Sequence, residues 1–222
     1  MKFTKLSLIT VLAVSAITTT AMAEISVSAN MGATSNYIWR GMTQTNDNAA
    51  IQGGFDVDFG GAYLGVWGSN ISWTTGEDSS LEADFYGGYA GEAAGIGYDI
   101  GYIRYAYPNV GDANNFDEVY LGLSKDFGSG FGVSGKYSKG VKVPTGGTKV
   151  DDWTVGATTG LGMDVELALN YGDYDTVGTR YSAGLSKSFG KFDIDVTYHD
   201  FSADSGSAAD EDNIVVSVGT SF

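Results

Sequence analysis

The chain ends in Asn213-Ile214-Val215-Val216-Ser217-Val218-Gly219-Thr220-Ser221-Phe222. Counted back from Phe222, every second position is apolar or threonine, and most positions between are small or polar. This period of two is typical of a β-strand with one apolar face and one polar face. About ten residues of tilted strand also span the hydrocarbon core of a membrane. An unpaired edge invites aggregation, so we expect this strand to pair with the first strand of a closed barrel.

The same alternation recurs through the chain and predicts about twelve strands. They are separated by Gly-rich turns near residues 60, 93, 129, 161 and 190 and by longer polar loops at residues 108–115, 139–150 and 202–212. Bacterial outer-membrane barrels show this asymmetry between their two ends, with an even strand count. We therefore predict an all-β fold, a transmembrane antiparallel up-and-down β-barrel over residues 24–222. Its first strand is expected to run from Glu24 to Trp39.

Residues 1–23 have the pattern of a secretory signal peptide. Lys2 and Lys5 form a basic start, an apolar run covers residues 6–17, and Ala21-Met22-Ala23 is a small-x-small cleavage site. The chain has no cysteine, which excludes disulfides, thiolate metal sites and a lipid-modified cysteine. We predict export through the periplasm to the outer membrane of a Gram-negative bacterium.

Charge and amino-acid composition limit the classes of molecule that the protein is expected to bind. The formal net charge is −15, which makes nucleic acid an unsuitable partner. The chain has 33 Gly, 14 Tyr and only 2 Pro, a mixture that suits strands and turns and not disorder. The partners expected are the lipid bilayer, lipopolysaccharide and small hydrophilic solutes. An aromatic last residue on an amphipathic last strand resembles the assembly signal of outer-membrane barrels, so Val216, Val218 and Phe222 are expected to engage the assembly machinery.

Aromatic residues gather at the two predicted ends of the strands. Beside the short turns are Phe59, Tyr63, Phe127, Phe131, Phe189, Phe192 and Phe222, and near the long loops are Tyr37, Trp39, Trp73, Tyr137, Trp153, Tyr171 and Tyr198. Two aromatic belts fit the two interfaces of a bilayer.

Alternate residues of a strand point to opposite faces, so if the apolar set faces lipid, the set between them lines the lumen. Many residues of this second set are acidic. The predicted lining residues are Asp56, Asp58, Asp99, Asp164, Glu166, Asp193 and Asp195 toward the short turns, Glu82, Asp84 and Glu118 toward the long loops, and Lys136 as the chief base. An acid-lined passage lowers the energy of cations and raises that of anions. We therefore expect a cation-preferring pore. Twelve strands lie between filled and open barrels, so the pore is expected to be narrow and partly obstructed by an inturned loop, residues 139–150 or 202–212.

Catalysis has little support in the sequence, and no catalytic, cofactor-binding or metal site is predicted. His199 is the one histidine. A serine hydrolase would need a serine beside it and a third group to orient it. Ser182 and Ser202 are the candidates, but no motif marks either. Paired acids such as Asp193 and Asp195 could serve acid–base chemistry or Ca²⁺, yet alternate inner positions of such a barrel are polar anyway.

One block of sequence resembles a known family. Ser35-Asn36-Tyr37-Ile38-Trp39-Arg40-Gly41-Met42-Thr43-Gln44-Thr45, followed by Ala50-Ile51-Gln52-Gly53-Gly54-Phe55 and Gly65-Val66-Trp67-Gly68-Ser69-Asn70-Ile71-Ser72, is similar to the TorF family of proteobacterial porin-like proteins. The resemblance is strongest over residues 35–73. It implies a porin-like role in the outer membrane and carries over no catalytic or binding residues. Arg40-Gly41 is expected to shape a turn at the rim or to set one positive charge against the acidic lumen.

The sequence thus predicts a porin-like channel for passive diffusion of small hydrophilic solutes. The alternatives are a non-conducting surface or structural barrel that acts through its loops as an adhesin or receptor, an outer-membrane hydrolase, and a soluble periplasmic barrel.

Overall fold

The structure is a computed structural model, and it describes residues 25–73, 80–108, 110, 114–143, 147, 149–206 and 208–222. The predicted signal peptide lies outside the described residues. Within them, no helix is long and apolar enough to cross a membrane.

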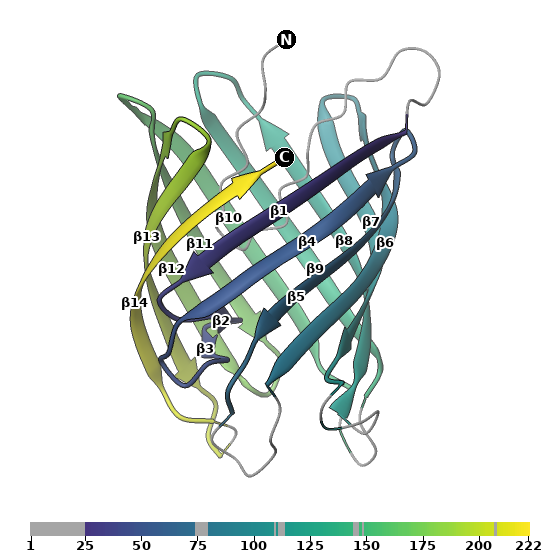
Figure 1. The fold of residues 1–222 in the computed structure, drawn as a ribbon, viewed down its shortest axis with the longest axis vertical. Helices are drawn as coiled ribbons and strands as arrows, with labels where there is room; N and C mark the ends of the chain where they lie inside the picture. Colours follow the sequence, from purple (N-terminus) through teal and green to yellow (C-terminus); the bar gives the residue numbers. More distant parts are fainter. Residues whose placement is uncertain are drawn as a thin grey trace.

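Twelve strands close into one antiparallel barrel, which confirms the predicted fold (Figure 1). The barrel strands are β1 (Ser26–Thr34), β4 (Ala50–Asp58), β5 (Ala62–Asn70), β6 (Leu81–Ala93), β7 (Ile96–Ala106), β8 (Phe116–Asp126), β9 (Phe131–Lys142), β10 (Asp151–Gly162), β11 (Val165–Tyr174), β12 (Gly178–Phe189), β13 (Phe192–Ala203) and β14 (Glu211–Ser221). Each pairs with its neighbours in sequence order, and β1 pairs with both β4 and β14.

The seam between β1 and β14 closes the barrel. Its register runs from Asn30 opposite Ser221 to Thr34 opposite Ser217. Beyond it, the Phe222 N–H donates to the Ala29 carbonyl at 2.9 Å, and the Ala29 N–H donates back at 3.2 Å. The final strand therefore has no free edge, which satisfies its backbone groups.

Side chains alternate between an apolar outer face and a polar inner face. Along β14, Ile214, Val216 and Val218 are exposed on the outside, and the side chain of Phe222 beyond it is 70% exposed. On β5, whose orientation the sequence left open, Leu64 faces out and Tyr63 faces the lumen, where it bonds Asp99. A broad exposed apolar surface is what a barrel presents to lipid.

The two ends of the barrel differ as expected. Short turns join β4 to β5, β6 to β7, β8 to β9, β10 to β11 and β12 to β13 at the upper end in Figure 1, where β1 also begins and β14 ends. We call this the short-turn end and the opposite one the long-loop end.

Four aromatic residues that were predicted to belong to the two outer belts lie inside the barrel instead. Tyr63 lies in the lumen, and Tyr37 is buried there, with Trp39 and Trp73 packed beside the same buried cluster. The others remain on the outer face, for example Phe131 and Phe189 near the short turns and Trp153 and Tyr171 near the long loops. Those outer rings sit where bilayer interfaces favour aromatic side chains.

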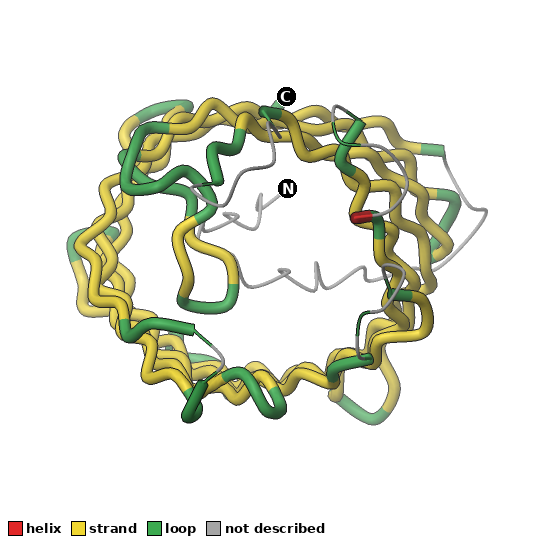
Figure 2. The backbone as a smooth tube through the Cα atoms, turned by 90° about the horizontal axis from the view of Figure 1, so that it is seen from below, coloured by secondary structure: helices red, strands yellow, loops and turns green. Residues whose placement is uncertain are grey.

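The first strand ends at Thr34, and the expected extension to Trp39 was wrong. The chain instead turns into the barrel and forms a small hairpin of β2 (Ile38–Trp39) and β3 (Met42–Thr43). Viewed along the barrel, this hairpin projects into the lumen (Figure 2). We call residues 35–49 the plug loop. The sequence had named residues 139–150 and 202–212 as candidates for the inturned loop. Residues 139–142 extend β9 and residues 202–203 extend β13, whereas residues 144–146, 148 and 207 of these two segments lie outside the described residues.

Candidate functional site

The tip of the plug loop is a two-residue turn, Arg40-Gly41. Ile38 pairs with Thr43 and Trp39 with Met42, and φ is 51° at Arg40 and 88° at Gly41. Two consecutive positive φ angles define the type I′ hairpin turn. A Cβ added at Gly41 would lie 2.9 Å from the Cβ of Phe201 on β13. Glycine is therefore needed here both for its backbone conformation and because the tip lies directly against the wall at β13.

Asn36 anchors the base of the plug loop. Its amide nitrogen donates to the Asp47 carboxylate at 2.8 Å and to the Asn213 side-chain oxygen on β14 at 3.1 Å. Its own side-chain oxygen accepts from the hydroxyls of Thr43 at 2.7 Å and Thr45 at 3.0 Å. The buried amide thus uses its full donor and acceptor capacity, which favours a single conformation of the loop.

Arg40 fastens the tip to the opposite wall. Its Nη2 lies 2.7 Å from Glu118 Oε2 on β8, and its Nε lies 3.5 Å from Asp152 Oδ1 on β10. Arg180 on β12 also binds Asp152, at 2.7 Å. The guanidinium carbon of Arg40 stacks 4.3 Å from the Trp39 ring centroid and 4.6 Å from that of Tyr174. Burial opposes the Arg40 charge, but Glu118 and Asp152 outweigh it and raise the pKa of Arg40 above its ordinary value.

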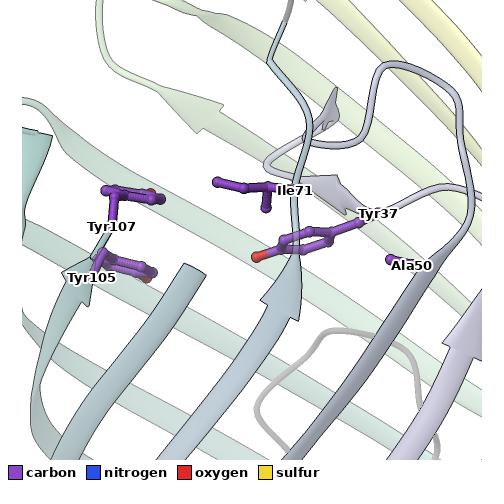
Figure 3. Close-up of a cluster of buried hydrophobic side chains, with 5 residues drawn as sticks. All are labelled: Tyr37, Ala50, Ile71, Tyr105 and Tyr107. Carbon is purple, nitrogen blue, oxygen red and sulfur yellow. The ribbon is translucent and has the colours of Figure 1, made fainter. Parts of the chain in front are cut away.

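An aromatic cluster holds the other side of the plug loop. Tyr37 packs with Ala50, Ile71, Tyr105 and Tyr107, which Figure 3 shows converging from neighbouring walls. The Tyr37 hydroxyl donates to Glu82 Oε1 on β6 at 2.8 Å. Because Tyr37 contacts the β5–β7 side and Arg40 the β8–β12 side, the plug loop crosses the lumen and narrows it.

The predicted lumen residues fall into several environments. Four carboxylates accept hydrogen bonds from hydroxyls: Asp56 from Tyr86, Asp99 from Tyr63, Asp193 from Ser188 and Asp195 from Thr197. The Lys136 ammonium lies 4.2 Å from the ring centroid of Tyr120, whose hydroxyl bonds that of Tyr63. Glu166 is half-buried on β11, opposite Ser186.

Two predicted residues belong to turns at the short-turn end. The Asp58 carboxylate accepts from the N–H of Gly60 at 2.8 Å, which caps the turn after β4. Asp164 is exposed in the turn between β10 and β11, with φ of 59°. These two acids therefore shape the rim and do not line the middle of the lumen.

The acids nearest the plug loop are deeply buried. Glu82, Asp84 and Glu118 are each at most 6% exposed. Among the described residues, Asp84 Oδ1 and Arg40 Nη1 are buried side-chain atoms without a hydrogen-bond partner. A buried carboxyl oxygen without a donor is costly, and burial beside other acids favours the neutral form of such a group, so Asp84 is an energetic weak point of the wall beside the constriction.

Sequence reasoning missed one of the lumenal cations. Arg40 was expected to shape a rim turn or to set one positive charge against the acidic lumen, and it pairs with the lumenal Glu118. Arg180 was not considered, although its position alternates with outward-facing Tyr181. Arg104 shares the parity of outward-facing Tyr102 and pairs with Asp117 at 3.1 Å.

His199 faces the lumen directly opposite Ser182, whose hydroxyl accepts from the Asn170 amide at 3.2 Å. Ser202 has the opposite parity along β13 and faces outward. Within the described part of the chain, His199 makes no hydrogen bond to Ser182, so the serine is not activated by it. The same part holds no group of three or more acidic, histidine or cysteine side chains arranged for a metal ion.

A cavity of about 520 Å³ opens beside the plug loop at the long-loop end. Its lining is Trp39, Met42, Gln44, Trp73, Tyr107, Asn114, Phe116, Glu118, Gly140, Lys142, Val143, Val150 and Tyr174. We call this cavity the vestibule.

Comparison with known proteins agrees with this geometry. Residues 18–222 match the model of a family described as "Bacterial protein of unknown function (Gcw_chp)". The chain belongs to the Gcw_chp family. No curated protein matches this Gcw_chp chain in sequence. The TorF resemblance stays a prediction.

Solved structures share the fold of this Gcw_chp barrel at low identity. The KdgM porin, also solved in complex with disordered oligogalacturonate, aligns with a TM-score of 0.63 at 14% identity, covering 88% of this chain and 99% of its own. Outer membrane phospholipase A from Escherichia coli gives 0.53 at 13%, covering 93% and 95%. The COG4313 outer membrane channel from Pseudomonas putida F1 gives 0.50 at 10%, covering 91% and 96%. All three are outer-membrane proteins, so the fold is that of outer-membrane barrels.

Proposed function

We propose that this Gcw_chp protein is an outer-membrane channel that passes small hydrophilic solutes passively and prefers cations. The observation that carries the proposal is the closed barrel with an apolar outside and a polar, acid-rich inside, narrowed by the plug loop. Outer-membrane barrels place short turns toward the periplasm and long loops outside the cell. The plug loop then stands at the extracellular side.

The balance of lumenal charge supports cation preference. The charge of Arg40 is neutralised by an ion pair with Glu118, and that of Arg180 by an ion pair with Asp152. Other inward carboxylates, among them Asp56, Glu166 and Asp193, are only partly buried, and Lys136 is the main remaining base on the wall that they share. Excess negative charge in a confined polar passage concentrates cations and repels anions. A polyanion such as the oligogalacturonate recorded with the KdgM porin is therefore not proposed as a solute here.

Reversal potentials in planar bilayers under a salt gradient test this proposal. A cation-preferring channel gives a reversal potential of the sign set by the cation gradient. The size of this potential declines when the salt concentration is raised on both sides, because salt screens the lumenal charges. A reversal potential of the opposite sign would refute cation preference.

One observation favours a second candidate. The plug loop touches both walls, through Tyr37 on one side and Arg40 on the other. A barrel plugged in this way could act through its surface loops without conducting. Liposome swelling separates the two functions: swelling in small sugars or amino acids supports the channel, and its absence together with absent ion current supports the non-conducting barrel.

A further inference from the structure

The vestibule has features of a binding site that simple passage of solutes does not require. Its lining includes five aromatic rings, those of Trp39, Trp73, Tyr107, Phe116 and Tyr174. Its volume, about 520 Å³, lies within the range of small-molecule sites. It lies beside the constriction, where any solute entering from the long-loop end must pass.

The rings are already fixed in place. The ring centroids of Trp73 and Tyr107 are 4.7 Å apart, and the Trp73 Nε1–H donates to Gln44 Oε1 at 3.2 Å. Trp39 meets Phe116 edge-on at 6.0 Å and Tyr174 at 5.6 Å. A rigid set of rings loses little conformational entropy when a ligand binds, so these rings are organised before binding.

Charge in the vestibule disfavours a cationic ligand. The faces of Trp39 and Tyr174 that would attract a cation already carry the Arg40 guanidinium. Among the described lining residues the carboxylate is that of Glu118, which is paired with Arg40, and Lys142 adds a second positive charge. A ligand that suits these walls is uncharged, with apolar patches for the rings and hydroxyls for the polar groups.

We propose that the vestibule binds neutral sugars of mono- to disaccharide size. The C–H face of a pyranose ring stacks on the aromatic rings. Its hydroxyls bond the remaining lone pairs of Glu118 and Gln44 and the ammonium of Lys142. The inference rests on the proposed channel, since it names the class of solute that the channel would take up first.

Tryptophan fluorescence of the purified full-length protein in detergent micelles tests the site. Neutral mono- and disaccharides of gluco, galacto and manno configuration are titrated, because Trp39 and Trp73 report from the vestibule. We expect a saturable change with at least one sugar. Trp73→Ala should weaken that binding about tenfold, the loss expected for one stacked ring. Trp153→Ala is the matched control, because Trp153 packs against Tyr171 on the outer face, away from the vestibule.

Lys142→Gln is a second variant in case Trp73→Ala does not fold, and it should weaken binding severalfold. Heat-modifiable migration on a gel verifies the barrel in every variant. The proposal is overturned if no sugar of the panel gives a saturable change, if Trp153→Ala weakens binding as much as Trp73→Ala, or if tetramethylammonium binds better than every sugar.

Current recordings separate this inference from the channel itself. Saturable sugar binding without ion current would refute the channel and leave the site standing. Ion current without saturable binding would refute the site and leave the channel standing.

Discussion

At the scale of residues, Arg40 controls how the plug loop is held. It is the one described group that joins the tip of the loop to both Glu118 and Asp152. Removing Arg40 would leave Glu118 without its cation, whereas Asp152 keeps Arg180. Breaking a buried ion pair in this way costs about 3–5 kcal/mol. Because the barrel strands do not depend on this contact, the cost falls on the docked position of the loop.

Arg40→Gln is therefore expected to free the plug loop while the barrel stays folded. Single-channel conductance should rise, and cation preference should increase because a lumenal positive charge is lost. Arg104→Gln is the control, since that arginine pairs with Asp117 on the outer face and should leave both quantities unchanged. Equal effects of the two substitutions would contradict this role of Arg40.

Asp84 is the lumenal acid with an unbonded buried oxygen. Asp84→Asn should leave the reversal potential close to that of the wild type, because deep burial already favours the neutral form of this carboxyl group. It should leave stability in urea unchanged or raise it by roughly 1 kcal/mol, since an amide can donate a hydrogen bond where the carboxyl oxygen has no partner. Asp193→Asn, at a partly buried lumenal carboxylate, is the comparison and should move the reversal potential toward zero; a larger shift from Asp84→Asn than from Asp193→Asn would contradict this difference between the two acids.

At the scale of elements, the plug loop is the part that the barrel does not need for closure. The Gln44 N–H donates to the Tyr37 carbonyl at 2.7 Å, so the two ends of the hairpin are close enough to be joined by a two-residue turn. Residues 38–43 can therefore be replaced by Asn-Gly, the pair that favours a type I′ turn.

This shortened variant should conduct more than the wild type and admit larger solutes in liposome swelling. The physical reason is that Trp39 and Arg40, which extend across the lumen, are removed. Unchanged conductance with an intact, heat-modifiable barrel would mean that the plug loop does not limit the passage.

The sequence predicted the long elements and missed the short one. Strands such as β13 and β14 alternate over enough positions to give a clear period of two. The hairpin strands β2 and β3 have two residues each, which is too short for any period. Tyr37 and Trp39 also kept the apolar parity of β1, so the pattern alone extended the first strand past Thr34. Arg40-Gly41 was expected to shape a turn, and it does so, but at the tip of a hairpin inside the lumen and not at the rim.

The sequence predicted which residues line the lumen, but not which of them contact one another. Parity identified Glu82, Asp84 and Glu118 as inward residues, but their neighbours depend on the register of strands distant in sequence. The pairing of Arg40 with Glu118 and of Arg180 with Asp152 required the closed barrel, because no local pattern brings β8, β10 and β12 to one loop.

At the scale of the whole molecule, the account depends on which medium covers each face of the wall. Adjacent residues on one strand should meet opposite surroundings. Leu169 and Val216 are exposed on the outer face, whereas Asn170 and Ser217 face the lumen, where their side chains bond Ser182 and Thr34. In a bilayer the first pair should touch hydrocarbon and the second pair water.

Spin labels at these four positions in reconstituted protein measure this directly, through collision with oxygen, which enriches in lipid, and with a water-soluble nickel chelate. We expect labels at Leu169 and Val216 to collide mainly with oxygen, and labels at Asn170 and Ser217 mainly with the chelate. Equal accessibility at neighbouring positions, or the reverse pattern, would contradict a membrane-spanning barrel with a polar lumen.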